Sequence, residues 1–254
     1  MKIAILGAHN IESASTGGVS LLVDDVIAID AGNLTSSLSF EAQMELKAVL
    51  LTHPHYDHLR DLPGLGMNIS LQEGSLDVYA IEPVFQALEE HLMNDTLYPN
   101  YFRRPAGKPV LRRHDLDIGK ETEAGGYKVL PVRMTHSVPA AGLLLTDRAG
   151  KKLFFTGDTG PGLTWEVVSP DLLIIETTAL NRMEQFALDS GHLTPSLLEK
   201  ELMAFRNSRG YLPRVVTVHM NPLDEAELRA ELDIAGSNLG IRIESGCEGM
   251  CIEL

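Results

Sequence analysis

Short apolar runs recur along the whole chain and are separated by polar or turn-forming residues. Runs that are rich in Val, Ile and Phe and too short for a typical helix indicate β-strands. They predict strands at residues 3–6, 20–23, 26–30, 48–51, 76–80, 127–134, 142–146, 152–156, 172–176, 215–218 and 250–254. Asp24-Asp25, between two of these runs, predicts a tight turn.

Apolar residues spaced four or three apart predict three helices with one buried face each. This spacing is found at Val84, Leu88 and Leu92, at Leu198, Leu202 and Phe205, and at Leu228, Leu232 and Ala235. Strands and helices alternate, and no repeat or low-complexity linker divides the chain. We therefore expect one α/β domain that spans residues 1–254.

The segment His-Pro-His-Tyr-Asp-His at residues 53–58 follows a predicted strand and offers four side chains that can bind metal. Imidazole and carboxylate ligands suit Zn²⁺, with Mn²⁺ or Fe²⁺ as alternatives. Neighbouring side chains on an extended segment point in opposite directions, so two ions accommodate them better than one. His53 and His55 would bind the first ion, and Asp57 and His58 the second. The alternative interpretation is a surface histidine cluster without metal.

Three further metal-binding side chains follow predicted strands elsewhere in the chain. His136 comes after the run at 127–134, Asp158 after an apolar run in a Thr-Gly-Asp-Thr-Gly context, and His219 after a β-branched run. The carboxyl ends of strands are where α/β sheets place their binding sites. Each of these residues taken alone could equally be a hydrogen-bonded structural residue.

This order of residues resembles the metallo-β-lactamase fold superfamily, whose pattern is H-x-H-x-D-H, then His, Asp and a late His. The resemblance implies an αββα sandwich of two mixed sheets with helices on the outer faces. It also implies two divalent metal ions, with three ligands on each and one residue that bridges them. By position, these are His53, His55 and His136 on one ion, Asp57, His58 and His219 on the other, and Asp158 between them. Asp30 would orient the metal loop without binding metal.

A water molecule shared by two such cations loses its proton near neutral pH, so a bridging hydroxide is the expected nucleophile. We count Asp57 among the catalytic residues as well as among the ligands. The metal pattern predicts a hydrolase, but it does not name the substrate. A diiron oxidoreductase, which usually has Glu in place of the second His, and a metal-holding protein without catalysis are the other classes considered.

His192 is the second predicted catalytic residue. It lies in Ser-Gly-His-Leu-Thr-Pro at 190–195, which resembles the Gly-His-Leu motif of class II cyclic-nucleotide phosphodiesterases and the region of a catalytic histidine in the ribonuclease Z group. His192 would protonate the leaving alkoxide or hold a phosphoryl oxygen, with Asp189 as a candidate to hold the imidazole. The alternative is a histidine in an ordinary helix-capping loop.

The segment Thr-His-Ser-Val-Pro at 135–139 is also similar to segments of both groups. Two features differ from ribonuclease Z: Asp61 stands where that family usually has Gly, and no long basic insertion is present. We therefore predict a phosphodiesterase for a small (cyclic) nucleotide or a related phosphodiester. The alternatives are a ribonuclease Z-like tRNA 3′ endonuclease and a lactone or thioester hydrolase.

The formal net charge of −14 at pH 7 repels phosphate backbones, so we expect a small anionic phosphodiester as partner and not a large nucleic acid. The most basic stretch is 98–105, in which Tyr101 could stack a nucleobase and Arg103 and Arg104 could bind phosphate oxygens. We predict these three as substrate-binding residues. An ordinary loop at a protein interface is the alternative.

Only two cysteines are present, and their spacing predicts that Cys247 and Cys251 pack on one face of a final strand. The first residues contain no signal-peptide pattern, and no apolar run approaches the length of a membrane span. We therefore expect a cytoplasmic protein without a membrane partner. A homodimer is common among the resembling groups, but the sequence does not name the oligomeric state.

Overall fold

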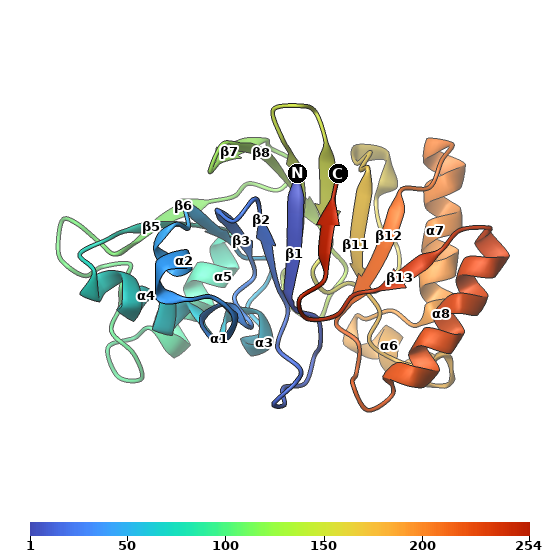
Figure 1. Ribbon diagram of the computed structural model, residues 1–254, viewed down its shortest axis with the longest axis horizontal. Coiled ribbons are helices and arrows are strands. Elements are labelled where there is room, and N and C mark those ends of the chain that lie inside the picture. The colour runs from blue at the N-terminus through green and yellow to red at the C-terminus, as the bar shows by residue number, and fades with distance from the viewer.

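The apolar runs form two seven-stranded mixed sheets in a computed structural model that describes residues 1–254. The sheets lie next to each other in the middle of the molecule, and helices lie on the outer sides of both (Figure 1). This arrangement confirms the predicted αββα sandwich. No helix combines the length and the apolar character that crossing a membrane requires.

The first sheet contains the N-terminal strands and one strand from the C-terminus. Its order is β14 (Cys251–Glu253), β1 (Lys2–Gly7), β2 (Ser20–Val23), β3 (Ile27–Ile29), β4 (Ala48–Leu50), β5 (Leu76–Ala80) and β6 (Leu111–Asp115). The pairs from β14 to β3 are antiparallel, and those from β3 to β6 are parallel. The carboxyl ends of β3 and β4 therefore meet at the same edge.

The second sheet is built from the C-terminal half of the chain. Its order is β13 (Ile243–Ser245), β12 (Arg214–Val218), β11 (Leu172–Glu176), β10 (Lys152–Phe155), β9 (Ala141–Thr146), β8 (Tyr127–Arg133) and β7 (Thr122–Ala124). The strands from β10 to β13 are parallel, so their following loops also gather at one edge.

The helices are short on the N-terminal side and longer on the C-terminal side. They are α1 (Leu34–Ser37), α2 (Phe40–Met44), α3 (Tyr56–Leu59), α4 (Leu62–Leu71), α5 (Glu82–Ala87), α6 (Glu184–Ser190), α7 (Pro195–Arg209) and α8 (Glu225–Leu239). A π-helical turn, η1 (Leu88–Leu92), continues α5, and 3₁₀ turns are η2 (Trp165–Val167) and η3 (Asn181–Met183). The Thr194 side chain accepts a hydrogen bond from Leu197 N and caps α7, whose first residue is Pro195.

Alternate residues of the central strands enter two different cores. In β10, Leu153 and Phe155 belong to the cluster between the two sheets, whereas Phe154 belongs to the cluster under α7 and α8. Phe154 meets Trp165 edge to face, with ring centroids 6.4 Å apart. Because both faces of these strands are covered, they read as continuous apolar runs in the sequence.

All eleven predicted strands are present, with ends shifted by one or two residues. The structure adds β6, β7 and β13, which lie at sheet edges and are polar or charged on their open side. Such strands are stabilised by pairing along one side only, and their sequences carry no apolar run. Asp24 and Asp25 have φ values of 47° and 60°, so the predicted tight turn is confirmed.

The expectation for the two cysteines is wrong. Cys251 lies on β14, but Cys247 lies in the loop before this strand, and both side chains are exposed. A turn at Glu248 and Gly249 separates the two residues, so they do not share a strand face. The predicted packing role therefore has no basis in the structure.

Candidate metal centre

Four loops and the start of α3 bring the seven predicted ligands together at one edge of the two sheets. The loops follow β4, β8, β10 and β12, as expected for the carboxyl ends of strands, and α3 continues the loop after β4. The predicted ligands form two compact groups, with ligand atoms within 4.8 Å of one another in each group, and a third such group contains His192 with Asp158 and His219. The first two groups are His53, His55, His136 and Asp158, and Asp57, His58 and His219.

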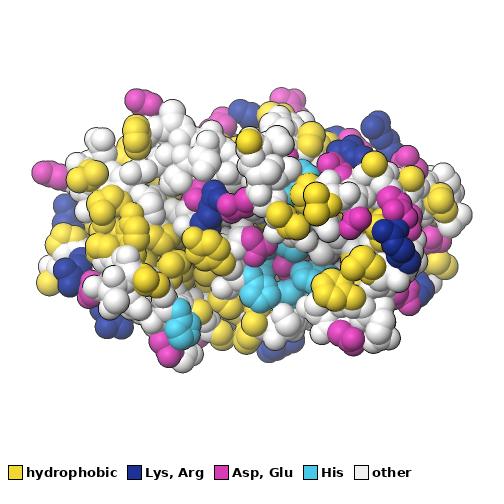
Figure 2. All heavy atoms as spheres, turned by 90° about the horizontal axis from the view of Figure 1, so that it is seen from below, with side chains coloured by type: hydrophobic (Ala, Val, Ile, Leu, Met, Phe, Trp, Pro, Cys, Tyr) yellow, Lys and Arg dark blue, Asp and Glu magenta, His cyan; other side chains and the backbone are white.

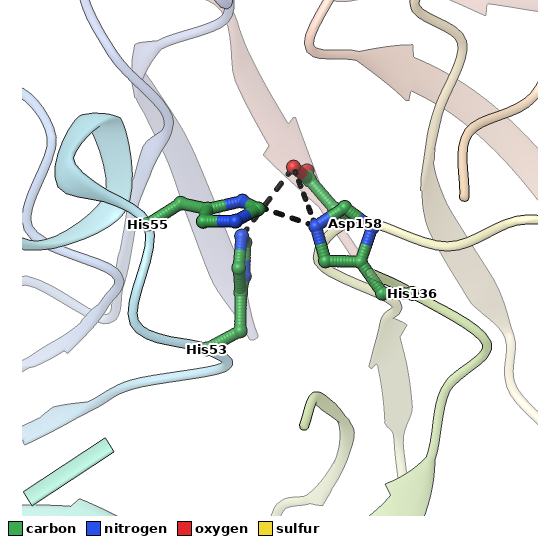
Figure 3. Close-up of side chains that lie close together, drawn as sticks. All are labelled: His53, His55, His136 and Asp158. Carbon is green, nitrogen blue, oxygen red and sulfur yellow. Dashed lines mark hydrogen bonds and ion pairs between the residues drawn. The ribbon is translucent and has the colours of Figure 1, made fainter. Parts of the chain in front are cut away.

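In the first group, three imidazoles and one carboxylate point toward a common space (Figure 3). His136 Nε2 lies 3.1 Å from His55 Nδ1, and His53 Nε2 lies 3.4 Å from Asp158 Oδ2. Ligands about 2 Å from one tetrahedral ion are roughly 3.3 Å apart. These separations therefore fit a single shared cation.

The second group is joined to the first through Asp158. His219 Nε2 lies 3.1 Å from Asp57 Oδ2, and His58 Nε2 lies 3.6 Å from the same oxygen. Asp158 Oδ1 is 3.3 Å from His58 Nε2, and its Oδ2 is 3.3 Å from His219 Nε2. The carboxylate of Asp158 thus faces both groups, which is the position that a bridging ligand requires.

Hydrogen bonds at the far ring nitrogens fix the orientation of four imidazoles. The Nδ1 contacts are His53 to Thr52 Oγ1 (3.0 Å), His58 to Asp30 Oδ2 (2.7 Å), His136 to Gly191 O (2.8 Å) and His219 to Thr178 Oγ1 (2.7 Å). Carboxylate and carbonyl oxygens only accept, so Nδ1 carries the hydrogen in His58 and His136.

The two threonine hydroxyls give the same result for the other two histidines. Thr52 donates its hydrogen to the Asp30 carboxylate, and Thr178 donates its hydrogen to Glu176. Each hydroxyl has one hydrogen, so it must accept from the histidine ring. In all four rings, Nε2 is then left with its lone pair toward the cluster, which is the form that binds metal.

Several of the inward-facing atoms are buried and unpaired. His53 Nε2, His58 Nε2 and Asp158 Oδ1 have no hydrogen-bond partner. A buried polar atom without a partner costs about 1–3 kcal/mol. Divalent cations at the two ligand groups would supply the missing partners of all three atoms. The residues present therefore fit a two-metal site of nitrogen and carboxylate ligands.

The charge states of these groups agree with a ligand role. Burial, together with the nearby charge of His58, lowers the pKa of His53 to about 3, so its ring is neutral at pH 7. Burial acts to raise the pKa of Asp158, but the surrounding histidines His219, His58 and His53 hold it well below its usual range. Metal ligands must be neutral imidazoles or ionised carboxylates, and the environment favours these forms in His53 and Asp158. Burial acts to lower the pKa of His58, but the carboxylates of Asp158 and Asp30 raise it well above its usual range, so a metal ion bound there would displace a proton.

Two residues at the site have left-handed backbone conformations without being glycine. Asp30 has φ of 57° and His219 has φ of 62°. Such conformations cost about 1–3 kcal/mol each and persist where the surroundings hold them. Asp30 is fully buried and accepts hydrogen bonds from Thr52 N at 2.8 Å and from His58. It therefore orients the metal loop without entering the cluster, as the resemblance implies.

His192 lies directly beside the ligand groups. Its ring stacks on His219, with centroids 5.3 Å apart and an interplanar angle of 17°. Its Nδ1 donates a hydrogen bond to Glu176 Oε1 at 2.7 Å. The expectation for Asp189 is wrong, because its carboxylate is exposed and accepts from the Gln185 side chain at 2.9 Å. Glu176, not Asp189, holds the imidazole.

Glu176 is the main functional residue that the sequence reading missed. It is completely buried at the end of β11, and its carboxylate also accepts from Thr159 N, Leu193 N and Thr178 Oγ1. Burial alone would lower the pKa of His192, but the charge and hydrogen bond of Glu176 raise it to about 9. The sequence does contain a signal for this residue, because Glu176 is an acidic residue at the end of an apolar strand.

The structure does not bring Tyr101, Arg103 and Arg104 to the histidine cluster. These residues line a separate surface pocket that contains none of the seven ligands. The Tyr101 ring is only 5% exposed, so it is not free to stack a base. Arg103 pairs with Glu89 at 2.6 Å and Arg104 pairs with Asp95 at 3.0 Å. Their predicted role in substrate binding therefore finds no support in the geometry.

Removing metal should lower the thermal stability of the protein measurably. A cation at 100 times its dissociation constant stabilises the folded chain by about 2.7 kcal/mol. For a chain of this size we expect chelation to lower Tm by roughly 5–10 °C. Differential scanning fluorimetry with a chelator, followed by excess Zn²⁺, measures this shift. An unchanged Tm in both conditions would contradict metal binding at this cluster.

Comparisons with known proteins agree with this geometry. A family model described as "Beta-lactamase superfamily domain" matches residues 22–220, which include all seven predicted ligands. Ribonuclease Z from Bradyrhizobium diazoefficiens is 27% identical, over 87% of this chain and 90% of that protein. Among solved structures, unliganded yeast PDE1 has a TM-score of 0.85 at 16% identity, covering 100% of this chain and 99% of that one. The short form of human tRNase Z has a TM-score of 0.69 at 20% identity, with the same coverage.

The names of two of these proteins place RNA among the substrates of relatives. These names argue against our expectation that a large nucleic acid is not a partner. The fold-level likenesses do not decide between the substrate classes, because their sequence identities are low. The family match, however, spans most of the chain. This protein therefore belongs to the β-lactamase superfamily and is a hydrolase with the metallo-β-lactamase fold.

Proposed function

We propose that this protein is a phosphodiesterase that acts on a small (cyclic) nucleotide or a related phosphodiester. The observation that supports this proposal best is the pair of His192 and Glu176 beside the two ligand groups. A carbonyl hydrolase needs the metal cluster, but it has less need for a second imidazole directed at the leaving group. A phosphodiester with an alkoxide leaving group needs a proton donor at this place.

Two divalent metal ions, with zinc favoured by the ligand set, complete the proposed site. When bound, such ions act as Lewis acids toward phosphoryl oxygens and make water more acidic. The residues that would hold them are His53, His55 and His136 at one centre, Asp57, His58 and His219 at the other, and Asp158 at both.

His192 supplies the proton in this proposal. Its Nδ1 hydrogen is engaged by Glu176, so its Nε2 is the atom that can reach a leaving oxygen. The carboxylate of Glu176 also stabilises the imidazolium form, because the two groups are 2.7 Å apart and Glu176 is completely buried. The pair therefore keeps a protonated donor in a fixed orientation next to the reacting bond.

The surroundings of the site favour a small substrate with an apolar or aromatic group. Tyr56, Phe186 and Leu223 are 63%, 53% and 85% exposed, and each lies within a few residues of the cluster in sequence. Figure 2 shows hydrophobic side chains on both sides of the histidines that are visible near the middle of this view. An aromatic side chain at such a place can stack a nucleobase.

Two arginines on the chain segments that carry the site residues are already paired with acids. Arg60 pairs with Glu12 and Asp61, and Arg182 pairs with Glu227 and Asp224. A polynucleotide gains most of its affinity from cations that neutralise its phosphates. Arginines that are held by carboxylates supply little of this attraction, so the face is better suited to a short phosphodiester.

A ribonuclease Z-like activity on tRNA is the second candidate. It is favoured by the similarity to ribonuclease Z from Bradyrhizobium diazoefficiens, which extends over 87% of this chain. Cleavage of a tRNA 3′ end would use the same metal ligands and the same proton donor. The two candidates differ in the size of the substrate and not in the chemistry of the site.

A substrate screen with metal-loaded protein separates these candidates. The substrates are cyclic nucleotides, bis(p-nitrophenyl) phosphate, precursor tRNA and a lactone, and metal content is measured on the same samples. We expect turnover of bis(p-nitrophenyl) phosphate and of a cyclic nucleotide. Faster cleavage of precursor tRNA than of any small diester would favour the second candidate. Activity confined to the lactone would contradict both.

Replacing Glu176 by Gln should slow the reaction while leaving substrate affinity nearly unchanged. The amide keeps the shape of the side chain but removes the charge that stabilises protonated His192. We expect kcat for a diester with a poor leaving group to fall roughly 10–100-fold, with a much smaller change in KM. Steady-state kinetics measure both constants. A matched control is Glu184→Gln on α6, and an equal loss in this control would contradict a specific role for Glu176.

A further inference from the structure

The loop that joins β1 to β2 supports two ligand residues of the second group from two sides. On its first arm, the carbonyl oxygen of Ala8 accepts a hydrogen bond of 2.6 Å from the backbone N–H of His219. On its second arm, Gly18 lies so close to the carbonyl oxygen of Asp57 that a Cβ there would be only 2.5 Å away. The positions of both ligands therefore depend on the conformation of this one loop.

A single carboxylate oxygen ties the two arms together. Glu248 Oε1 accepts from Ala8 N at 3.2 Å, from Gly17 N at 2.9 Å and from His9 Nδ1 at 2.7 Å. His9 is 3% exposed, and its own backbone N–H donates to Gly17 O at 3.1 Å. Glu248 belongs to the segment before β14, which passes beside the end of β1 (Figure 1). The C-terminus of the chain thus closes a loop near its N-terminus.

Glu248 is ionised in this position. Burial acts to raise its pKa, but hydrogen bonds from His9 and from Gly17 N lower the pKa to about 2. Hydrogen bonds to an ionised acceptor are roughly twice as strong as those between neutral groups. The carboxylate is therefore a firm attachment point for both arms of the loop.

The strained backbone of His219 makes this support important for metal binding. A residue with φ of 62° that is not glycine relaxes unless its surroundings hold it. Thr178 holds the ring of His219, and Ala8 holds its backbone N–H. The neighbouring Met220 forms an isolated β-bridge with His9, which extends the same support. Loss of the loop conformation would therefore release His219 toward a relaxed conformation.

We propose that Glu248 is a positioning residue for the second metal centre. It does not contact the ligand atoms, but it fixes the loop that holds the backbones of His219 and Asp57. No hydrogen bond joins this loop to His53, His55 or His136, so the first centre should be independent of Glu248. This inference rests on the proposed ligand set and not on the proposed substrate.

The test is a Zn²⁺ titration of the metal-free protein against a chromophoric chelator, which resolves two affinities. In Glu248→Ala we expect one affinity to weaken about 10–100-fold, the usual effect of removing a residue that orients a ligand, while the other stays unchanged. Glu248→Gln should be intermediate, because its amide oxygen still accepts from backbone N–H groups. Glu253→Ala, an exposed carboxylate on β14, is the matched control and should leave both affinities unchanged.

A purely structural role for Glu248 would give a different pattern. General destabilisation would weaken both affinities alike, and this outcome in the Ala and Gln variants would overturn the proposal. Unchanged affinities in Glu248→Ala would overturn it as well. If the Ala variant does not fold, the Glu248→Gln and Glu248→Asp variants take its place. The same criterion applies: one Zn²⁺ affinity should weaken while the other stays unchanged. The readout is metal affinity, so inactivity on phosphodiesters leaves this test intact.

Discussion

Replacing Asp158 by Ala is expected to lower metal occupancy at both centres and to abolish turnover. Its two oxygens lie 3.3–3.4 Å from Nε2 of His53, His58 and His219, so both groups lose a negative ligand in one substitution. Loss of several kcal/mol of charge stabilisation corresponds to at least about a 10³-fold loss of rate. The metal content measured after dialysis should fall from about two ions per chain to well below one.

His219→Ala provides the contrast for this prediction. His219 belongs to the second group, so its loss should lower occupancy mainly at one centre. Asp189→Ala is the matched control for removal of a carboxylate, because Asp189 is exposed and its carboxylate accepts a hydrogen bond from the Gln185 side chain. A fully occupied two-metal site in the Asp158 variant would show that this residue does not bridge the centres.

Replacing His192 by Ala is expected to leave the metal content intact and to slow the cleavage of demanding substrates. The Nδ1 atom of His192 is hydrogen-bonded to Glu176, and the ring stacks on His219. Neither of the two groups of predicted ligands includes His192. Turnover of a phosphodiester with a poor alkoxide leaving group should fall roughly 10²–10⁴-fold, the range of general acid–base catalysis. Cleavage of a p-nitrophenyl diester needs little protonation and should fall much less.

The comparison of the two substrates distinguishes proton donation from simple positioning. Equal losses on both substrates would indicate that His192 only positions the substrate. Loss of metal in this variant would mean that His192 itself is a ligand, which its position near Asp158 and His219 makes a concrete alternative. His91→Ala, an exposed histidine outside the cluster, should change neither rate nor metal content.

The strands and the seven predicted ligands could be read from the sequence because their signals are local, whereas the αββα arrangement was implied by the resemblance to a known superfamily. A buried strand leaves an apolar run, and a ligand at its carboxyl end appears directly after this run. His53, His136, Asp158 and His219 all occupy such positions, and the two sheets then gather them in two compact groups. The likeness of this order to a known superfamily added the division of the ligands between two ions.

The partners of these residues could not be predicted, because they are distant in sequence and are chosen by packing. Asp189 is three residues from His192, yet the sheet places Glu176 against the imidazole and turns Asp189 to solvent. Tyr101 is aromatic, but its ring is buried in the core and is not free to stack a base. The edge strands β6, β7 and β13 form through backbone pairing with a neighbouring strand, and their own side chains carry no apolar run that would predict them.

The sequence by itself therefore determined which side chains can bind metal and which strands present them. The tertiary structure decided which groups orient these side chains, through contacts such as Thr178 with His219 and Glu248 with the arms of the first loop. The physical reason is that a metal ligand is recognised by its own chemistry. A supporting hydrogen bond exists only once two remote segments are packed together, and any Thr or Glu could have supplied it.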